Sequence, residues 1–290
     1  MIVPFAPGGI SDILARMIAQ KLADATGQAV VVDNRGGASG NIGTEMAANA
    51  APDGYTLLFC SPAFATNVSL FAHAGYDPLK DFVPVAEVAS ATNVVVATPA
   101  IGVHSMKQLI DGARAQPGSL NYGSGGAGTS GQLAAELLQM AVNIRMVHVA
   151  YKGAGPALTA LLSNEVQVMF APVILVLSHV RSGKLVALAV TSGERSRAFP
   201  DVPTVAEAAV PGFDVTSWFG VVAPAATPRD RIDLIHRHIA RALRMSDVGE
   251  RMIAQGAEPG WRTVDEFGAY IRSEVEKWAR VIKSAGIKVQ

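Results

Sequence analysis

The stretch Val3-Pro4-Phe5-Ala6-Pro7-Gly8-Gly9-Ile10-Ser11-Asp12 decides how the fold of this chain is interpreted. Its apolar run ends in proline and glycine. Apolar residues then recur at helical spacing, and Ser11 or Asp12 can cap the first helical turn. This order predicts a strand, a glycine turn and a helix start. Glycines let a ligand approach the backbone, and free N–H groups at a helix start favour an anion. The stretch therefore predicts either an anion site or an ordinary strand-to-helix loop.

The composition is typical of a globular protein with a large hydrophobic core. The chain has 290 residues, of which 50% are hydrophobic and 17% charged, enough for one large or two ordinary domains. The formal net charge of +0 carries no signature of nucleic-acid or anionic-membrane binding. No apolar run reaches the length of a membrane span. The single cysteine, Cys60, lies in an apolar run and is expected to be buried in a strand.

The first part of the chain predicts two strand–helix units in succession, which is typical of a parallel sheet. Residues 29–32 are all alanine or valine and predict a buried strand. A glycine-rich segment then opens a second helix, with Ile42, Met46 and Ala50 spaced along it, and another strand ends at Cys60. The polar segment 61–81 is expected to be a loop, and the valine-rich residues after it form one or two strands.

A new alternation of helices and strands begins after residues 99–104, which predicts that the chain crosses into a second domain there. A helix with a capping box at Ser105 comes first, followed by a short strand and a second glycine turn, Ser124-Gly125-Gly126-Ala127-Gly128-Thr129. Three further strands then alternate with helices. The apolar strand 218–223 predicts the return crossing, and long helices starting near residues 228 and 263 complete the chain.

Motifs for nucleotide binding fit poorly. Residues 126–132 resemble a phosphate-binding Walker loop only loosely, because Gln132 stands where that loop requires lysine. Residues 37–43 lack the glycine spacing of the dinucleotide fingerprint.

Catalytic and metal motifs are also weak. The residues around Ser124 do not fit the nucleophile-elbow motif, because Tyr122 occupies one of its glycine positions. A hydrolase triad would need His179 or His236 as its base. No histidine forms a metal-ligand pair with Cys, Asp or Glu. The remaining couple, His236 and His238, faces two directions on one helix, which favours a solvated surface. We therefore expect no catalytic residue, metal or cofactor.

The features that remain are two turns rich in glycine and hydroxyl groups, one in each half of the chain. Ligands of open α/β sheets bind outside the carboxyl ends of the strands. Two such turns can hold an anion through backbone N–H groups and hydroxyls without an acid–base pair. The pattern favours a binding protein over an enzyme.

The chain resembles the Bug (TctC-like) family, the periplasmic substrate-binding receptors of the tripartite tricarboxylate transporter system. The resemblance covers nearly the whole chain. It rests on Val3-Pro4-Phe5-Ala6-Pro7-Gly8-Gly9 with Asp12 and Arg16, Val31-Val32-Asp33-Asn34-Arg35, Gly40-Asn41-Ile42-Gly43, Pro52-Asp53-Gly54-Tyr55-Thr56-Leu57-Leu58, Tyr76-Asp77-Pro78, Gly123-Ser124-Gly125-Gly126 with Gly128-Thr129, His148-Val149 with Tyr151-Lys152-Gly153, Pro203-Thr204-Val205-Ala206-Glu207 and Trp218-Phe219-Gly220.

This resemblance implies an α/β, two-domain periplasmic-binding-protein fold of type II (Venus flytrap) with two hinge crossings. Residues 1–100 and 222–290 would form domain 1, residues 101–221 domain 2, and the ligand cleft would lie between them. The resemblance also implies a cleaved secretory signal, a periplasmic location, and delivery of a small carboxylate to the membrane components of the transporter. We expect a monomer that binds no nucleic acid.

The resemblance also implies a set of site residues. One ligand carboxylate would be held by the two glycine turns, and a distal wall would set specificity. The candidate ligand-binding residues are Phe5, Ala6, Pro7, Gly8, Gly9, Asp12, Phe64, Thr66, Asn67, Ser124, Gly125, Gly126, Gly128, Thr129 and Ala171, with Ala65 also a candidate for the distal wall.

Two positions depart from the family pattern. Ala171 stands where members usually carry an acidic residue, and Gln132 where a histidine is common. Loss of the acidic side chain disfavours an amino-acid ammonium group, so a di- or tricarboxylate or an aromatic carboxylate is expected. Two other functions stay open: a receptor that feeds a signalling system, and a serine esterase acting through Ser124.

Overall fold

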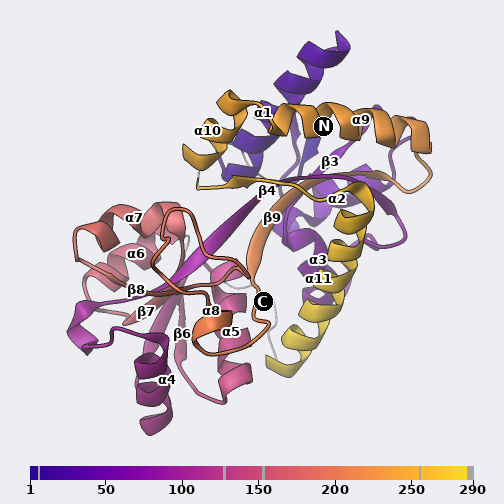
Figure 1. Cartoon of the computed structure of the whole chain (residues 1–290). Coiled ribbons are helices and arrows are strands. Elements are labelled where there is room, and N and C mark those ends of the chain that lie inside the picture. The colour runs from indigo at the N-terminus through magenta and orange to yellow at the C-terminus, as the bar shows by residue number, and fades with distance from the viewer. Residues whose placement is uncertain (6, 127–128, 152–153, 255, 286–290) are drawn as a thin grey trace. The chain divides into compact units, whose positions relative to one another are not determined.

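The computed structural model describes residues 1–5, 7–126, 129–151, 154–254 and 256–285 (Figure 1). Unit 1 consists of Met1–Ser90 and Trp218–Lys283, and Ala91–Ser217 form the body of unit 2. Two strands carry the chain between the units, β4 (Phe82–Ala97) outward and β9 (Thr216–Pro224) back. The divisions therefore fall inside strands, whereas the sequence prediction placed them after residues 100 and 221.

The sheet of unit 1 contains β1 (Ile2–Val3), β2 (Asp33–Asn34), β3 (Leu58–Cys60) and β10 (Glu258–Pro259) together with β4 and β9. The order is β2-β1-β3-β9-β4, and β10 pairs with β4. β1 is parallel to β2 and β3, whereas β9 runs antiparallel to β3 with Cys60 opposite Gly220. The carboxyl ends of β1 and β3 consequently lie at one edge of the sheet, and the end of β9 lies at the other.

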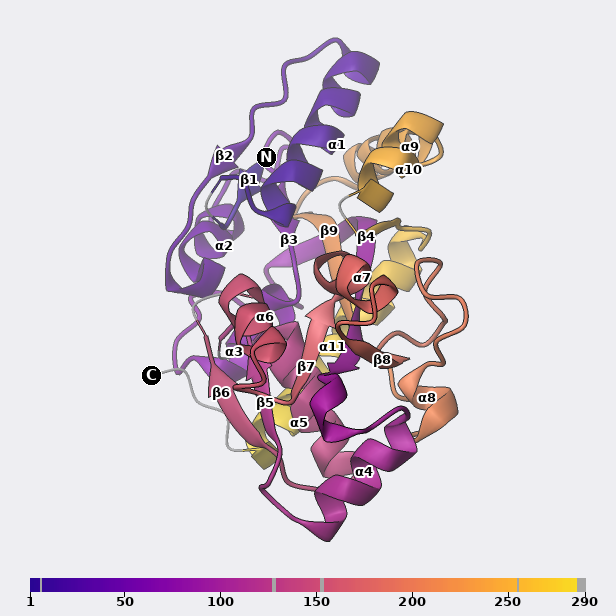
Figure 2. The same ribbon diagram turned by 90° about the vertical axis from the view of Figure 1, so that its left-hand side faces the viewer.

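Helices flank this sheet. α1 packs along α9, and both views show the two side by side (Figures 1 and 2). Gly220 is needed where β9 passes beneath the last helix, because a Cβ there would come within 2.3 Å of Phe267. The helices of unit 1 are α1 (Ile10–Thr26), the 3₁₀ turn η1 (Ala38–Gly40), α2 (Asn41–Ala48), α3 (Ala63–Leu70), α9 (Arg229–Leu243), α10 (Ser246–Ala254) and α11 (Val264–Ala285).

The core of unit 1 is aromatic. Trp218 packs edge-on against Phe267 at 5.7 Å, and Phe64 stacks on Tyr76 at the same centroid distance. Glu274 of α11 is buried and accepts hydrogen bonds from the indole N–H groups of Trp218 (3.2 Å) and Trp278 (2.9 Å). This pairing satisfies polar groups that would otherwise be costly to bury.

Unit 2 is built on the second half of β4, which β7 (Val168–Pro172) and β8 (Val186–Val190) flank on either side. From β7 the sheet continues through β5 (Asn121–Ser124) to β6 (Val147–Ala150), and these last three strands are parallel. The helices are η2 (Pro99–Ile101), α4 (Met106–Ala115), α5 (Ser130–Val142), α6 (Ala154–Leu162), α7 (Val173–Arg181) and α8 (Val205–Ala208).

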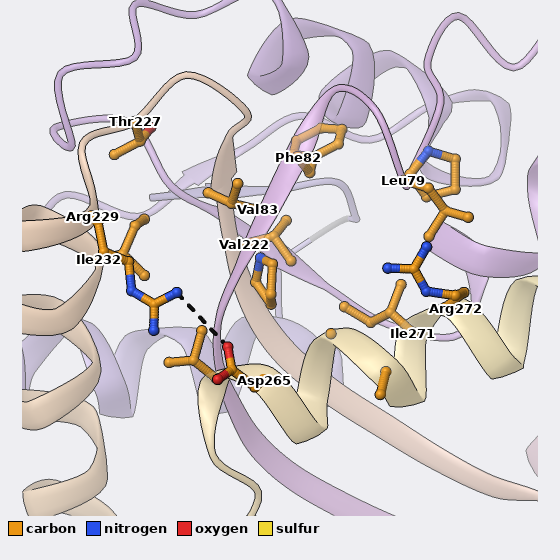
Figure 3. Close-up of a pocket in the computed structure, with 15 residues that line it drawn as sticks. Leu79, Phe82, Val83, Val222, Thr227, Arg229, Ile232, Asp265, Ile271 and Arg272 are labelled. Carbon is orange, nitrogen blue, oxygen red and sulfur yellow. Dashed lines mark ion pairs between the residues drawn. The ribbon is translucent and has the colours of Figure 1, made fainter.

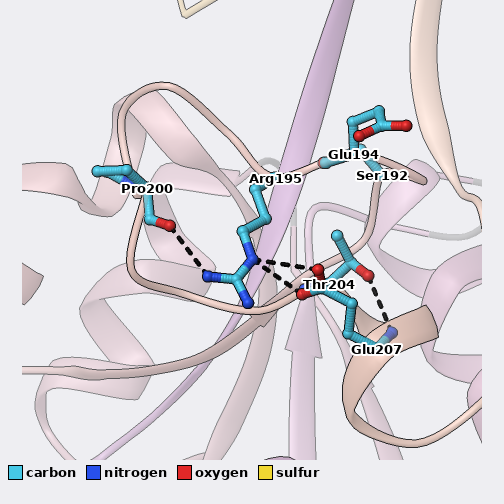
Figure 4. A network of polar contacts seen from close by, with 6 residues as sticks. All are labelled: Ser192, Glu194, Arg195, Pro200, Thr204 and Glu207. Atoms are coloured by element: carbon cyan, nitrogen blue, oxygen red, sulfur yellow. Dashed lines mark hydrogen bonds and ion pairs between the residues drawn. The ribbon is translucent and has the colours of Figure 1, made fainter.

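A polar network fixes the long loop between β8 and α8. Thr204 and Glu207 form a reciprocal capping box at the start of α8. Arg195 joins this box by donating from Nε to the Glu207 carboxylate (2.9 Å) and from Nη1 to the Pro200 carbonyl (3.2 Å) (Figure 4). The loop therefore has defined hydrogen-bond partners although it contains no long element.

Several predicted elements are correct and others are not. Cys60 is buried in β3 as predicted, and one continuous strand, β4, accounts for the valine-rich region. Residues 29–32 do not form a buried strand: Val31 is 71% exposed, and pairing with β1 begins only at Asp33. The reason is that β2 is an edge strand whose partner has only two residues.

Two other errors concern helices. Segment 61–81 was predicted as a loop but contains α3, whose buried face includes Phe64 and Asn67. In α2, the predicted apolar residues Ile42 and Met46 are exposed, and the smaller side chains of the helix face the core. Within the ranges given above, no helix is long and apolar enough to span a bilayer.

Candidate functional site

One acidic side chain holds the first glycine turn, residues 4–9, at the carboxyl end of β1. The Asp12 carboxylate accepts hydrogen bonds from the Gly8 N–H (2.9 Å) and from Asn34 Nδ2 (3.0 Å). It also pairs with the Arg16 guanidinium (2.9 Å). Asn34 Nδ2 donates in addition to the Phe5 carbonyl (3.1 Å). Gly8 has a φ of +86°, which glycine adopts without strain. These contacts fix the path of the chain from β1 into α1.

The charge of Asp12 is compensated. Burial alone would raise the pKa of Asp12, but hydrogen bonds from Arg16, Gly8 and Asn34 and the charge of Arg16 hold that pKa below its usual range. Asp12 is therefore ionised and neutralised by Arg16. The turn carries no uncompensated negative charge that would repel an anion.

α1 begins directly after this turn without a side-chain cap. Gly9 is the N-cap residue, with φ −78° and ψ 168°, and as a glycine it has no side chain that could cap the helix. The first N–H groups of a helix lack intrahelical partners and carry partial positive charge. The start of α1 can therefore offer backbone donors to an anion.

The predicted distal-wall residues of unit 1 lie on α3. Phe64, Thr66 and Asn67 are all buried, and Phe64 packs against Tyr76 and Phe82 in the core. Ala65, also a candidate, is fully buried.

Asn67 connects α3 to the turn at residues 37–40. Its Nδ2 donates to the Ser39 carbonyl (3.0 Å) and to Asn41 Oδ1 (2.7 Å). Ser39 has a φ of +56°, an uncommon conformation for a residue other than glycine. Ser39, Phe64 and Asn67 line one small pocket with Phe5, and that pocket has no room for a water molecule. Ser39 and Asn41 were not predicted as site residues; the signals for them in the sequence are the Gly36-Gly37 pair and the family segment Gly40-Asn41-Ile42-Gly43.

In the described part of the second glycine turn, residues 124–126 and 129, the hydroxyls point inward. Ser124 Oγ and Thr129 Oγ1 both donate to the Gly126 carbonyl, at 3.1 and 2.8 Å, and the Gly126 N–H donates back to Ser124 Oγ (3.2 Å). Gly126 has a φ of +126°. Because the Thr129 hydroxyl turns back into the loop, no side chain caps the start of α5. This helix start can offer backbone donors, as the start of α1 does.

Ser124 also contacts a histidine that the sequence analysis had not placed in the site. His148 Nε2 lies 2.7 Å from Ser124 Oγ, and Gln132 Nε2 lies 3.3 Å from His148 Nδ1. The imidazole stacks on Tyr122, whose hydroxyl donates to Glu136 (2.5 Å). Burial lowers the pKa of His148. The ring is therefore neutral at pH 7.

The remaining predicted residues have varied environments. Ala171 is fully buried in β7, where it pairs with Val94 of β4. Pro7 is exposed, and Gly125 is half-buried. Ala6 and Gly128 lie outside the described residues.

The sequence matches a family model over residues 14–287, that of the "Tripartite tricarboxylate transporter family receptor", TctC. The chain belongs to this family. Among similar TctC proteins is BugT of Bordetella pertussis, 41% identical over all of this chain and 90% of the relative. Another is the UPF0065 protein in the tcbD-tcbE intergenic region of Pseudomonas sp. strain P51, 36% identical over 97% of this chain and 84% of the relative.

Solved structures agree with the family and with the predicted α/β, two-domain periplasmic-binding-protein fold. An R. palustris protein solved with adipate is 35% identical, covers 99% of this chain and 97% of its own, and has a TM-score of 0.81. MatC from Rhodopseudomonas palustris, with bound malate, is 31% identical over 97% of both chains, with a TM-score of 0.78. The periplasmic binding protein BugD is 33% identical over 100% of this chain and 98% of its own, with a TM-score of 0.77.

TctC proteins are receptors, not enzymes, and the structural neighbour BugD is a periplasmic binding protein. The local chemistry around Ser124 agrees. The histidine at Ser124 is His148, rather than His179 or His236, and its other nitrogen faces the neutral amide of Gln132 instead of a carboxylate. Ser124 is 1% exposed, so its hydroxyl is enclosed. The esterase alternative is therefore wrong.

The large pocket of unit 1 is separate from the first turn. It measures about 490 Å³ and lies between α9, α11 and the segment that precedes β4, with an Arg229–Asp265 ion pair (3.7 Å) across its rim (Figure 3). Val222 of β9 lines it, so it lies at the sheet edge opposite the carboxyl ends of β1 and β3. Of the predicted ligand-binding residues that the structure describes, none lines this pocket.

Proposed function

We propose that this TctC receptor binds a small carboxylate through the two glycine turns. It would deliver that carboxylate, as a periplasmic monomer, to the membrane components of a tripartite tricarboxylate transporter. One observation carries the proposal: α1 and α5, the helices that follow the two turns, both begin without a side-chain cap. Their first N–H groups can donate hydrogen bonds to a carboxylate in place of a capping side chain.

The bound carboxylates of two structural neighbours support this ligand class. Adipate and malate each carry two carboxylates, and the proteins that hold them are 35% and 31% identical to this chain. Charge-assisted hydrogen bonds contribute roughly 1.5–3 kcal/mol each, so several backbone donors suffice for micromolar binding without a lysine or arginine.

The expected ligand is a plain di- or tricarboxylate, or an aromatic carboxylate, rather than an acidic amino acid. Ala171 offers no carboxylate to an ammonium group, and its surroundings in β7 and β4 are apolar. An uncompensated ammonium group would lose its hydration there without gaining a partner.

Titration calorimetry with adipate, malate, aspartate and benzoate tests the proposal. We expect micromolar binding of at least one of the three ligands without an amino group, and weaker binding of aspartate. A thermal-shift screen should agree, because a ligand at about 100 times its Kd adds roughly 2.7 kcal/mol of stability. Wild-type protein that binds none of the four, while the R. palustris protein solved with adipate binds adipate under the same conditions, would contradict the proposal.

Gly9→Val tests the first turn directly. The φ of Gly9 is −78°, which valine can adopt, so the variant should fold while its side chain blocks the approach to the start of α1. We expect binding to be abolished. Gly112→Val on α4 is the matched control, since a Cβ at Gly112 meets nothing within 4 Å and lies in no predicted site. Gly126→Val cannot serve the same purpose, because its φ of +126° would strain any L-residue.

A further inference from the structure

A chain of hydrogen bonds leads from α5 to the second glycine turn. Gln132 Nε2 faces His148 Nδ1 at 3.3 Å, His148 Nε2 faces Ser124 Oγ at 2.7 Å, and Ser124 Oγ donates to the Gly126 carbonyl at 3.1 Å. Parallel pairing of β5 with β6 aligns these groups, with Tyr122 opposite His148. The imidazole is held in plane by its stacking on Tyr122, at 4.8 Å between ring centroids.

The directions of these bonds are determined by the first donor. An amide nitrogen can only donate, so Gln132 Nε2 requires Nδ1 of a neutral His148 to be an acceptor. The ring proton then resides on Nε2, which donates to Ser124 Oγ. Ser124 Oγ thus accepts from His148 and from the Gly126 N–H, and its own proton goes to the Gly126 carbonyl. Every donor and acceptor of the serine hydroxyl is used, with one donated and two accepted bonds.

This arrangement fixes Ser124, Gly126 and Thr129 relative to one another. The Gly126 carbonyl accepts from Ser124 Oγ and from Thr129 Oγ1, which places both hydroxyls on the inner side of the loop. If Ser124 instead donated to His148, the Gly126 carbonyl would lose one of these two hydroxyl donors. The opposite His148 tautomer would therefore loosen the loop that precedes the uncapped start of α5.

We propose that His148 is a positioning residue for carboxylate binding. Held by Gln132 in the Nε2–H form, it fixes Ser124 and thereby the turn that presents the backbone donors of α5. This inference rests on the proposed function, because it assigns His148 and Gln132 a part in the same site. It requires neither residue to touch the ligand.

The first test reads the tautomer without any ligand. In ¹⁵N spectra of uniformly labelled protein, His148 should show a protonated Nε2 and an unprotonated Nδ1 at pH 7.5, assigned by the signals that disappear in His148→Gln. Gln132→Glu should move the ring proton to Nδ1, because a carboxylate accepts and cannot donate. Gln132→Met keeps the length of the side chain without a donor, and should give a mixture of the two forms. A wild-type His148 protonated on Nδ1 would overturn the inference.

The second test measures affinity for the carboxylate that binds wild-type protein best among adipate, malate and benzoate. His148→Gln retains an N–H of similar reach, and should bind within about threefold of wild type. His148→Leu removes the donor and should bind about tenfold more weakly, a loss of about 1.4 kcal/mol. Far-UV circular dichroism and thermal melts confirm that each variant is folded.

The two proposals fail in different ways. If wild-type protein binds none of the carboxylates but shows the Nε2–H form, the proposed function fails and the network stands as a structural feature. If wild-type protein binds, and His148→Leu binds equally well, the positioning role is wrong while the proposed function holds. Should His148→Leu not fold, Gln132→Met replaces it, with a loss of at least threefold expected and an unchanged affinity overturning the role.

Discussion

At the scale of single residues, Asp12 organises a turn that contains no large side chain. Asp12 is 4% exposed, and its carboxylate contacts the Gly8 N–H, the Asn34 amide and the Arg16 guanidinium. A glycine-rich segment has much conformational freedom, and specific hydrogen bonds restrict it. The precise path of the first turn therefore depends on a residue that follows it in the sequence.

Asp12→Asn should lower the free energy of unfolding by roughly 1–3 kcal/mol. The amide cannot form the charge-assisted bonds to Arg16, and the buried hydrogen-bond donors around it lose part of their acceptor. Urea denaturation measures the change. Asp24→Asn is the matched control on the same helix: Asp24 is exposed and accepts a single hydrogen bond from Gln20 (2.8 Å). Equal effects of the two variants would show that Asp12 does not hold the turn.

The same carboxylate predicts a dependence of stability on pH. The pKa of Asp12 is lowered in the folded protein, so its stabilising contribution is complete above the unfolded value of about 3.9 and is lost as the pH falls through the lower folded value. The difference in unfolding free energy between wild type and Asp12→Asn should therefore be constant from pH 5 to 7 and shrink below about pH 4. A difference that disappears near pH 6 would assign the effect to another group.

Ala171 gives a further residue-scale prediction. Its side chain is fully buried among apolar residues of β4 and β7. Ala171→Asp should consequently destabilise the protein by roughly 3–5 kcal/mol, the typical cost of a buried charge without a partner. Ala171→Ser is the milder control. If the melting temperature of Ala171→Asp equals that of wild type, the prediction is wrong and the new carboxylate reaches solvent. The order in which this variant binds the carboxylates and aspartate then tests whether residue 171 belongs to the distal wall.

At the scale of elements, sequence periodicity succeeded where one face of an element is apolar. The long helices α9 and α11 were predicted because their apolar residues recur at helical spacing, whereas β4 was predicted as one or two strands from its valine-rich composition. Residues 29–32 were misjudged because valine-rich composition says nothing about the length of the partner strand. α3 was missed because its buried face includes Thr66 and Asn67, and polar residues at such positions are typical of a loop.

The candidate site, too, could be predicted only in part from the sequence. Glycine turns before helices leave a local signature, so residues 4–9 and 124–129 could be singled out from the sequence. His148 and Gln132 could not be linked to Ser124, because their proximity comes from the pairing of β5 with β6 and the packing of α5. No local pattern encodes that register.

The capping box of α8 gives an element-scale prediction. Thr204 is buried, and its hydroxyl accepts from the Glu207 N–H at 3.0 Å (Figure 4). Thr204→Ala should cost about 1–2 kcal/mol of stability, and Thr204→Ser should retain most of it. Arg195→Ala should cost less than about 1 kcal/mol, because both ends of its ion pair with Glu207 are exposed. Chemical denaturation of the three variants tests this order, and a larger loss in Arg195→Ala would reverse it.

At the scale of the whole molecule, the chain forms each unit from a different set of elements, yet it builds the same feature in both. Unit 1 contains a strand, a glycine turn and the uncapped helix α1, and unit 2 contains the equivalent series ending in α5. β4 and β9 carry the chain between the units, which fold around separate cores. The proposed function requires both turns to bind one carboxylate, so the two helix starts should respond to the ligand together.

Hydrogen exchange measured by mass spectrometry tests this coupling. A carboxylate at about 100 times its Kd should slow exchange at the starts of both α1 and α5, by up to about 100-fold where exchange requires ligand release. The start of α4 is the internal control, because the Ser105 hydroxyl already accepts from the Gln108 N–H there (3.2 Å) and leaves no vacant cap for a ligand. Gly9→Val should remove the protection at both helix starts, because a ligand shared by the two turns cannot be retained by one of them at the same affinity. Protection confined to a single helix start in the wild-type protein would show that one turn binds the carboxylate alone, and the bipartite site would then be wrong.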